Sequence, residues 1–399
     1  MNIYFITSKL NFRTSGGSIE EFDFVVRSLL QSGHKLTVVT SYSSRNDIPE
    51  PLPYPVIEEE IGTSGLLGMQ SAIYKLLKKY EHSADIFLVD AHLFMYGAGL
   101  YRLLGGKKPV AAFVNQYLMC WPQYFSSYFP QPTVSFPRRI KRALRFNIEK
   151  YIGMVLANNV DIYAFVSPTL RKMYENFGIR HIDGDIIIGD PIDFAHIMRE
   201  GKVAKTSYRD RLKRSGPYLL FFSSRMSPGK GFDMFLQGFA RVKNKDDFRV
   251  ILGGTGPEAL EVAKMVKSLN LEKYVTLPGW VDKDQLYAYY READVFIQAD
   301  WWVEGTSISL LYALAFGVPS ILPGGGGLQW NAGEGALYFP YRDPDLLARR
   351  IEELAANPDL RAKLSENCYE RLTKDDMNYP ALIADFGKRM EQIVAAHAK

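Results

Sequence analysis

Short apolar runs that alternate with amphipathic helical patterns are the feature of this sequence that most constrains its fold. The runs are rich in Val, Ile and Phe, and the segments between them place apolar residues at helical spacing. Such alternation predicts a parallel sheet with helices on both faces, so we expect an α/β fold. The strand-like runs are Asn2–Thr7, Lys35–Thr40, Ile86–Val89, Val110–Val114, Ile162–Val166, Ile186–Ile188, Tyr218–Phe222, Arg249–Leu252, Val275–Leu277 and Val295–Gln298.

The chain is long enough to divide into domains. A length of 399 residues exceeds what one ordinary hydrophobic core organises, so two domains with a cleft between them are expected. A polar, basic stretch without clear periodicity, residues 196–216, is predicted to be the linker. The expected domains are residues 1–195 and 217–375, followed by a C-terminal helix over 376–399 that can cross back to the first domain.

Charge and cysteine content exclude several functional classes. The formal net charge is +4 and the six His show no metal-ligand spacing, so nucleic acid is not an expected partner. Cys120 and Cys368 lie far apart in the sequence, which fits a reducing compartment better than a disulfide framework. The sequence opens without a signal-peptide pattern, and no apolar run approaches the ~18 residues of a membrane span. We therefore expect a cytoplasmic protein.

The stretch 301–327, WWVEGTSISLLYALAFGVPSILPGGGG, predicts a ligand site at the start of a buried helix. Apolar residues cover most of a helix from about Ser307 to Phe316, and Gly317 ends it. The residues before it, Glu304-Gly-Thr306-Ser307, leave the first backbone N–H groups uncovered. Because the positive end of the helix dipole lies behind these groups, the site suits a phosphate.

Two cations follow the first strand of the second domain, on the loop Ser224-Arg225-Met-Ser-Pro-Gly-Lys230-Gly231. Such a pair suits a diphosphate and can neutralise the charge that grows on a phosphate oxygen as a bond to it breaks. The loop lacks the spacing of a P-loop. The next turn, Gly254-Thr-Gly256, lacks the third glycine and the later acidic residue of a dinucleotide fingerprint, which disfavours a dehydrogenase.

Polar residues also follow strands of the first domain. Gly16-Gly17 lies where a backbone can approach a phosphate, although most glycine pairs are simple turns. His92, Asn115 and Gln116 come just after strands, at the carboxyl edge where α/β proteins bind ligands. Ordinary loop polarity explains these residues equally well, so both interpretations stay open.

No metal site and no hydrolase triad is predicted. The tight carboxylate pairs that stand out, Asp183/Asp185 and Asp343/Asp345, enclose Gly or Pro and indicate turns. Neither Cys nor any His lies in a recognisable nucleophile motif.

Residues 116–151 interrupt the alternation with a segment dense in aromatic and basic residues. An amphipathic helix that rests on an anionic membrane has this pattern. A helix packed on its own domain with a solvated basic face explains it equally well. The apolar stripe is Ile140, Leu144, Ile148 and Tyr151, and the cations around it are Arg138, Arg139, Lys141, Arg142 and Arg145.

Together these motifs make the chain similar to glycosyltransferase family 4, along its whole length and most specifically over residues 217–345. The similarity implies the GT-B fold, in which two Rossmann-like domains with parallel sheets face each other across a cleft. It also implies sugar transfer with retention and without an essential metal or other cofactor, from a nucleotide-sugar on the second domain to an acceptor on the first. The motifs are Gly16-Gly17, Gly33-His34, the Arg225/Lys230 loop, Gly254-Thr-Gly256-Pro257, Val275-Thr-Leu-Pro-Gly279-Trp280-Val281, and Glu304-Gly305 before the helix that ends at Gly317-Val-Pro319.

The resemblance assigns a role to each matching residue. Arg225 and Lys230 would hold the donor diphosphate. Glu304 would contact the transferred sugar, and Val281 would contact the nucleobase through its main chain. The other donor-side positions are Gly16, Gly17, Gly254, Thr306, Ser307 and Ile308.

A few positions depart from the family pattern. Tyr312 stands where a second glutamate usually bonds the ribose hydroxyls. Asn115 or Gln116 replaces the His that is common on the acceptor side, and Ser224 replaces a glycine. Some family members vary at these places, and others have lost activity.

The leading hypothesis is a retaining glycosyltransferase that moves a sugar from a nucleoside diphosphate to a glycan or lipid-linked acceptor, in polysaccharide or glycolipid assembly. Such a protein would be cytoplasmic, with a peripheral place on a membrane as a further option. The alternatives are a nucleotide-sugar epimerase of the same fold and a non-catalytic binding or scaffold subunit. A phosphorylase would need a lysine-held pyridoxal site, which the sequence does not reveal.

Overall fold

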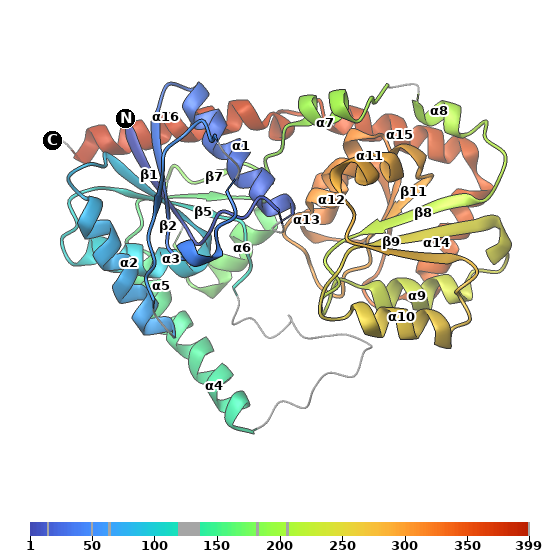
Figure 1. The fold of residues 1–399 in the computed structure, drawn as a ribbon, viewed down its shortest axis with the longest axis horizontal. Helices are drawn as coiled ribbons and strands as arrows, with labels where there is room; N and C mark the ends of the chain where they lie inside the picture. The colour runs from blue at the N-terminus through green and yellow to red at the C-terminus, as the bar shows by residue number, and fades with distance from the viewer. Residues whose placement is uncertain are drawn as a thin grey trace. The chain divides into compact units, whose positions relative to one another are not determined.

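The computed structural model describes residues 1–13, 16–48, 51–62, 65–118, 136–180, 183–204 and 207–397. Within these ranges the chain forms two compact α/β units (Figure 1). The first unit contains residues 1–118, 136–192 and 378–397, and the second contains 193–377. The stretch 196–216, predicted to be a linker, carries most of α7 (Phe194–Glu200) and all of α8 (Ser207–Arg211) and groups with the second unit.

The first unit is built on a seven-stranded sheet in the order β3-β2-β1-β4-β5-β6-β7, and every pairing is parallel. Ile3 at the start of β1 pairs with Leu36 of β2 and with Ile86 of β4. The strands therefore end together at one carboxyl edge. They are β1 (Asn2–Thr7), β2 (Lys35–Thr40), β3 (Val56–Glu58), β4 (Ile86–Asp90), β5 (Val110–Val114), β6 (Ile162–Phe165) and β7 (Ile186–Ile187).

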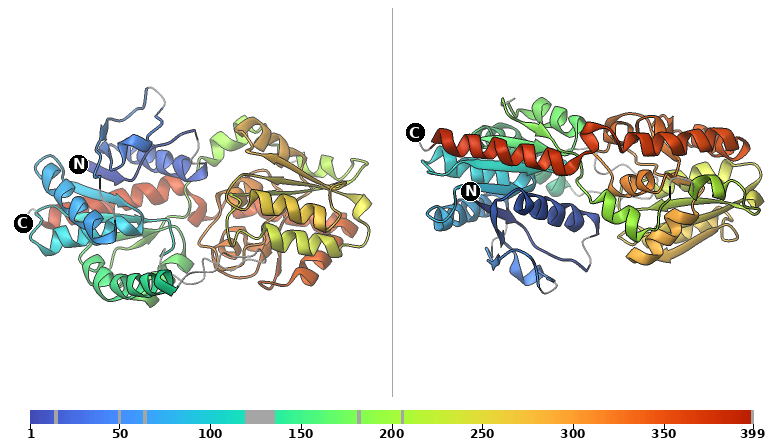
Figure 2. Two further views of the ribbon diagram at one scale, coloured as in Figure 1. Left: turned by 60° about the horizontal axis from the view of Figure 1, so that its bottom comes forward. Right: turned by 90° about the horizontal axis from the view of Figure 1, so that it is seen from above.

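Helices cover this sheet, and the last of them comes from the C-terminal end of the chain. That helix, α16, packs on α1 (Figure 2), and Ile383, Phe386 and Met390 on it are completely buried in the core of the first unit. The helical elements of the unit are α1 (Gly17–Gln31), η1 (Ser43–Arg45), α2 (Leu66–Tyr80), α3 (Ala91–Leu103), α4 (Phe136–Asn147), the π-helical segment η3 (Ile148–Gly153), α5 (Met154–Ala157), α6 (Pro168–Phe177) and α16 (Tyr379–His397).

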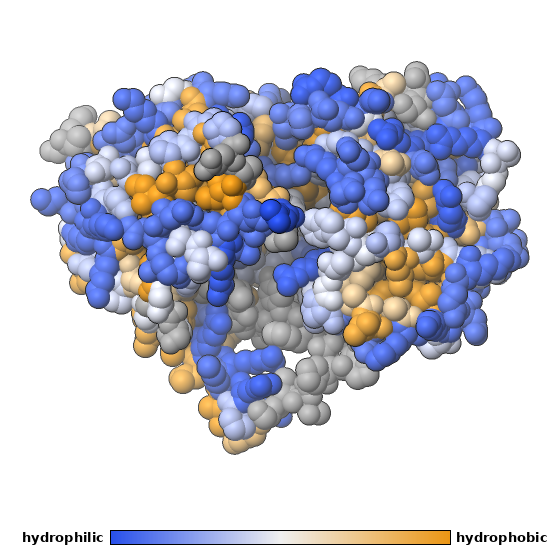
Figure 3. Space-filling model, viewed as in Figure 1, coloured by the Kyte–Doolittle hydropathy of each residue, from blue (hydrophilic) through white to orange (hydrophobic). Residues whose placement is uncertain are grey.

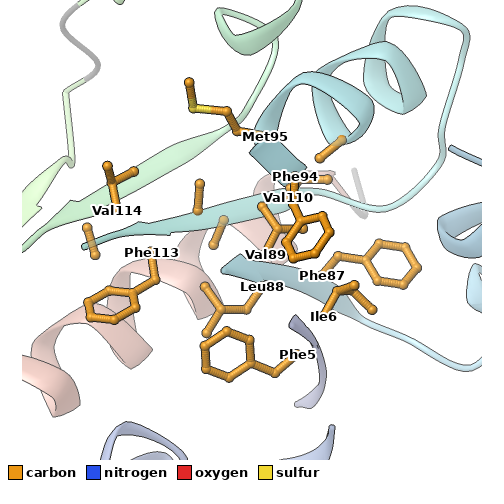
Figure 4. Packing of buried hydrophobic residues seen from close by; sticks show 14 of the residues in the cluster. Phe5, Ile6, Phe87, Leu88, Val89, Phe94, Met95, Val110, Phe113 and Val114 are labelled. Atoms are coloured by element: carbon orange, nitrogen blue, oxygen red, sulfur yellow. The ribbon is translucent and has the colours of Figure 1, made fainter. Parts of the chain in front are cut away.

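Both faces of the central strands are buried in this unit. Phe87 and Leu88 are neighbours on β4, so their side chains point to opposite faces of the sheet, yet both are completely buried (Figure 4). Burying one such side chain stabilises the fold by roughly 1.5–3 kcal/mol. A strand buried on both faces has no polar alternation, which explains the unbroken apolar runs of the sequence.

The second unit repeats this architecture with a six-stranded parallel sheet in the order β10-β9-β8-β11-β12-β13. The predicted fold class, two α/β domains with parallel sheets, is thereby confirmed. The strands are β8 (Tyr218–Ser223), β9 (Phe248–Gly253), β10 (Val275–Gly279), β11 (Val295–Ile297), β12 (Ser320–Pro323) and β13 (Ala336–Phe339). The helical elements, besides α7 and α8, are α9 (Phe232–Arg241), η4 (Lys245–Asp247), α10 (Ala259–Ser268), α11 (Lys283–Glu292), α12 (Ile308–Ala315), α13 (Gly326–Ala332), η5 (Gly333–Gly335), α14 (Pro344–Ala356), α15 (Pro358–Arg371) and η6 (Asp375–Met377).

Candidate active site

Loops from three adjacent strands cross at the carboxyl edge of the second sheet. The loop after β8 is bonded to the loop after β9, since Met226 N donates a hydrogen bond to Thr255 O at 2.8 Å. It is also bonded to the loop after β11, since Trp301 N donates to Gly229 O at 2.9 Å. Because β9, β8 and β11 are neighbours in the sheet, their parallel direction brings these loops to one place.

Glycines allow these backbones to touch. A Cβ atom on Gly254 would lie 1.9 Å from Ser224 O, and one on Gly229 would lie 1.6 Å from a ring atom of Trp302. Gly229 also has a left-handed backbone, with φ +86°. The glycines at these two positions are therefore required by the packing of one loop on the next, whether or not a ligand contacts them.

Lys230 and Glu304 form the closest contact between charged groups at this edge. Lys230 Nζ lies 2.6 Å from Glu304 Oε1, and the same oxygen accepts a hydrogen bond from Trp302 Nε1 at 2.8 Å. Burial acts to lower the pKa of Lys230, but the charges of Glu304 and Asp300 outweigh it and raise that pKa. Lys230 is therefore a cation, and its side chain is 26% exposed, so it can still meet an anion.

Arg225 lies on the same loop as Lys230 and is exposed. Its guanidinium group forms no hydrogen bond or ion pair with any residue that the structure describes. A guanidinium group in this state can bind two phosphate oxygens at once.

The start of α12 lies at the same sheet edge. Ser307 caps the helix, because its Oγ accepts a hydrogen bond from Leu310 N at 3.3 Å. The preceding loop is fixed by Gly327 N, which donates to Glu304 O at 2.8 Å. Thr306 and Ile308 are half-buried, and the positive end of the helix dipole lies beside them. Two cations and a helix N-terminus thus belong to one sheet edge, which suits a diphosphate.

Tyr312, on α12, takes part in aromatic packing. Its ring is buried and stacks on the rings of Tyr287 and Tyr290, with centroid distances of 6.0 Å and 5.8 Å. Val281 follows the end of β10 and is half-buried against Gly253, where a Cβ atom would lie 2.9 Å from Val281 Cγ2. The predicted contacts of Tyr312 with ribose and of Val281 with a base stay predictions.

The predicted acceptor-side residues lie at the carboxyl edge of the first sheet. Asn115 follows β5 and its Nδ2 donates a hydrogen bond to Glu21 Oε2 at 3.1 Å, so its amide is engaged within the unit. Gln116 is exposed, and its carbonyl accepts from the Tyr174 hydroxyl at 2.9 Å. His92 lies in the first turn of α3, and its side chain is outside the described part of the structure.

The glycine pair of the first unit lies at the start of α1. Gly16 precedes the helix with a left-handed φ of +60°, and Gly17 is its first residue. The residues just before them, 14 and 15, lie outside the described ranges.

Sequence reasoning missed several buried groups near these residues. Glu21 is 3% exposed, and burial, with the nearby charge of Asp190, raises its pKa well above the usual range, while the hydrogen bond from Asn115 opposes this. In the second unit, Asp300 and Trp302 flank the Lys230–Glu304 pair. Two consecutive tryptophans just before a glutamate were a usable signal for Trp302, whereas no pattern pointed to Asp300 or Glu21.

Comparisons with known proteins agree with the resemblance inferred from the sequence. A family model described as "Glycosyl transferases group 1" matches residues 204–371. The alpha-monoglucosyldiacylglycerol synthase of Streptococcus pneumoniae is 30% identical over 257 residues, which are 62% of this chain and 55% of that protein. The match thus spans little more than half the length of this curated relative.

Solved structures match over the whole chain. Sucrose-phosphate synthase from Thermosynechococcus elongatus superposes with a TM-score of 0.76 at 19% identity, covering 99% of this chain and 100% of that one. HepE from Anabaena in complex with UDP-glucose gives a TM-score of 0.70 at 14% identity, covering 99% and 100%. At these identities the likeness concerns the fold, and it confirms the predicted GT-B architecture.

The close approach of Gly229 to Trp302 predicts the effect of Gly229→Ala. Overpacking typically costs about 1–3 kcal/mol in addition to the strain of a left-handed backbone. Gly216→Ala is a matched control, because Gly216 has φ +127° but no neighbour within 4 Å. We expect Gly229→Ala to lower the free energy of unfolding in urea by about 1–3 kcal/mol more than Gly216→Ala. An equal loss of unfolding free energy in the two variants would show that the Trp302 ring moves aside without destabilising the fold.

Proposed function

Since a family model described as "Glycosyl transferases group 1" matches residues 204–371, we propose that this protein is a retaining glycosyltransferase. It moves a sugar from a nucleoside diphosphate to a glycan or lipid-linked acceptor. The observation that carries this proposal is the convergence of Arg225, Lys230 and the start of α12 beside Glu304 at one sheet edge. The structure of HepE with UDP-glucose and the relative named as a glycolipid synthase support the classes of donor and acceptor.

The chemistry follows from the charges at this edge. The bond between the anomeric carbon and the diphosphate oxygen breaks, and its electron pair stays on that oxygen. Arg225 and Lys230 stabilise the new charge together with the N–H groups that begin α12. The leaving diphosphate takes the proton of the acceptor hydroxyl, whose oxygen forms the new bond on the same face of the sugar. Because side chains and a helix end stabilise the charge, the reaction needs no metal ion or other cofactor.

A panel of nucleoside diphosphate sugars tests this function. We expect the protein to hydrolyse one donor slowly without acceptor, at a rate that a chelator does not change. Stabilisation against heat by that donor and its nucleoside diphosphate serves as the binding control. A rate that appears only with added Mg²⁺ or Mn²⁺ would contradict metal independence.

A non-catalytic sugar-nucleotide-binding or scaffold subunit is the second candidate. It is favoured by Tyr312, which is buried in an aromatic stack where a ribose-binding glutamate is expected. In the donor panel, tight binding of a donor with no hydrolysis and no transfer would favour this reading. Interconversion of two sugar nucleotides would instead indicate an epimerase.

Substitutions of the two cations test the proposed chemistry. Removing a preorganised stabiliser of developing charge typically lowers turnover ~10²–10³-fold, so Arg225→Ala and Lys230→Ala should each lower kcat by about that factor. Glu304→Gln should lower kcat while sparing the affinity for the bare nucleoside diphosphate, because its proposed partner is the sugar. Tyr312→Phe keeps the stacked ring and is the matched control with a small effect. Folded Arg225 and Lys230 variants that turn over the donor like the parent would show that this edge is not the active site.

We further propose that the first unit rests on an anionic membrane through α4. This helix buries none of its residues, and Ile140 and Leu144 on its apolar stripe are 52% and 58% exposed. Figure 3 shows hydrophobic and hydrophilic side chains on different sides of the α4 region at the lower end of the view. An exposed apolar stripe beside exposed cations favours a membrane surface over packing within the unit. None of the described helices is long and apolar enough to cross a membrane.

Vesicle binding tests this contact. The protein should pellet with vesicles rich in anionic lipid at low salt and leave them at high salt, because added ions screen the attraction. The quadruple variant Arg138→Ala, Arg139→Ala, Lys141→Ala, Arg142→Ala should stay in the supernatant. A matched control removes four exposed cations of the second unit, Lys213, Arg214, Lys264 and Lys267. If both variants pellet equally, α4 is not the contact.

A further inference from the structure

A second carboxyl group lies beside Lys230, and the mechanism above does not use it. Asp300 follows β11 and is 1% exposed, and its Oδ1 lies 3.5 Å from Lys230 Nζ. Its carboxyl group interacts with the side chains of Gln298 and Glu304, although in the described part of the chain neither of its oxygens makes a hydrogen bond of ordinary length and angle. A charged carboxylate left in this state would be costly, because burial removes its hydration.

Among the described residues, the charged groups that act on Asp300 are one cation and one other acid. Lys230 comes from the loop after β8, and Glu304 comes from the loop before α12. Tyr341, after β13, faces both acids with a buried hydroxyl that has no partner among the described residues. Gln298, which directly follows β11, is neutral, and its side chain acts to lower the pKa of Asp300. Burial raises the pKa of Asp300 well above its usual range; Lys230 opposes this, and Glu304 adds to it.

The charge of this group decides whether it can meet a diphosphate. With both acids ionised, Lys230, Glu304 and Asp300 together carry one negative charge and repel the donor phosphates. With one proton kept by the two acids the group is neutral, and the exposed part of Lys230 can turn to the phosphates. Two acids that share a site favour this state, because one proton removes their repulsion.

We propose that Asp300 is a positioning residue that works as a carboxylic acid, keeping its proton, donating a hydrogen bond to Glu304 and thereby holding Glu304 and Lys230 in place for the donor. This inference rests on the proposed function and adds a residue to that site. The acid touches neither sugar nor phosphate; it acts through its two neighbours.

Two substitutions of Asp300 test whether its side chain acts as a protonated carboxylic acid or as a carboxylate anion. Asp300→Ala removes the donor group, and we expect kcat/KM to fall about 10- to 100-fold, as for the loss of one hydrogen bond to a charged group. Asp300→Asn is neutral, has the same shape and still donates a hydrogen bond, so it should restore kcat/KM to within about threefold of the parent. Thermal unfolding of both variants, with and without UDP, shows whether each is folded and binds nucleotide.

Infrared spectra of the parent and Asp300→Asn provide a readout that needs no donor. At pH 7 the parent should show a carbonyl band of a buried carboxylic acid that Asp300→Asn lacks. The proposal is overturned if the band is absent, if Asp300→Asn is as impaired as Asp300→Ala, or if Asp300→Ala behaves like the parent. A parent that binds and cleaves no sugar nucleotide contradicts the proposed function instead, and the infrared spectra still decide whether Asp300 carries the proton.

Discussion

The contact of Lys230 with Glu304 is the interaction on which the candidate active site depends. It joins the loop after β8 to the loop after β11, and the hydrogen bond from Trp302 to the same oxygen fixes the carboxylate. An ammonium group paired in this way is held in one place, whereas a surface lysine samples many rotamers. This fixed position helps catalysis only if the pairing with Glu304 leaves the positive charge of Lys230 able to interact with the donor phosphates. The partial exposure of Lys230 and the neutral form proposed for Asp300 both serve that condition.

The glycines of the site have a structural explanation that is independent of ligand binding. Gly229 and Gly254 are needed because a neighbouring loop touches them, and Gly327 is in the same situation, since its Cβ atom would lie 1.4 Å from Gly305 O. Motifs of this kind mark the place where loops from adjacent strands cross. Because α/β folds bind ligands at the carboxyl edge of the sheet, such a crossing also forms the wall of a site. Packing and ligand binding therefore favour glycine at the same positions. A glycine motif alone does not show which of the two requires it.

The sequence revealed the strands that are buried on both faces and missed one edge strand of each sheet, β3 in the first and β13 in the second. β1, β2 and β5 have the predicted bounds, because continuous apolar runs are a strong signal. β3, at one edge, holds only Val56–Glu58, which are half-buried or exposed and give no apolar run. His92 was expected just after a strand, and it does follow β4, which leads directly into α3 there. The cationic loop and the start of α12 were predictable from local spacing. The surroundings of Asp300 were not, because they come from segments far apart in the sequence.

Buried acids change the charge that an anionic ligand meets at each sheet edge. Glu21 lies at the carboxyl edge of the first sheet and Asp300 at that of the second, and burial is the largest cause that raises the pKa of each. Each also lies near another carboxylate, Asp190 in one unit and Glu304 in the other, so that one proton per pair is favoured. A formal count gives these four acids four negative charges, and one proton kept by each pair would leave two. The formal net charge of +4 counts every acid as ionised, so it leaves out the protons that burial favours at these two edges.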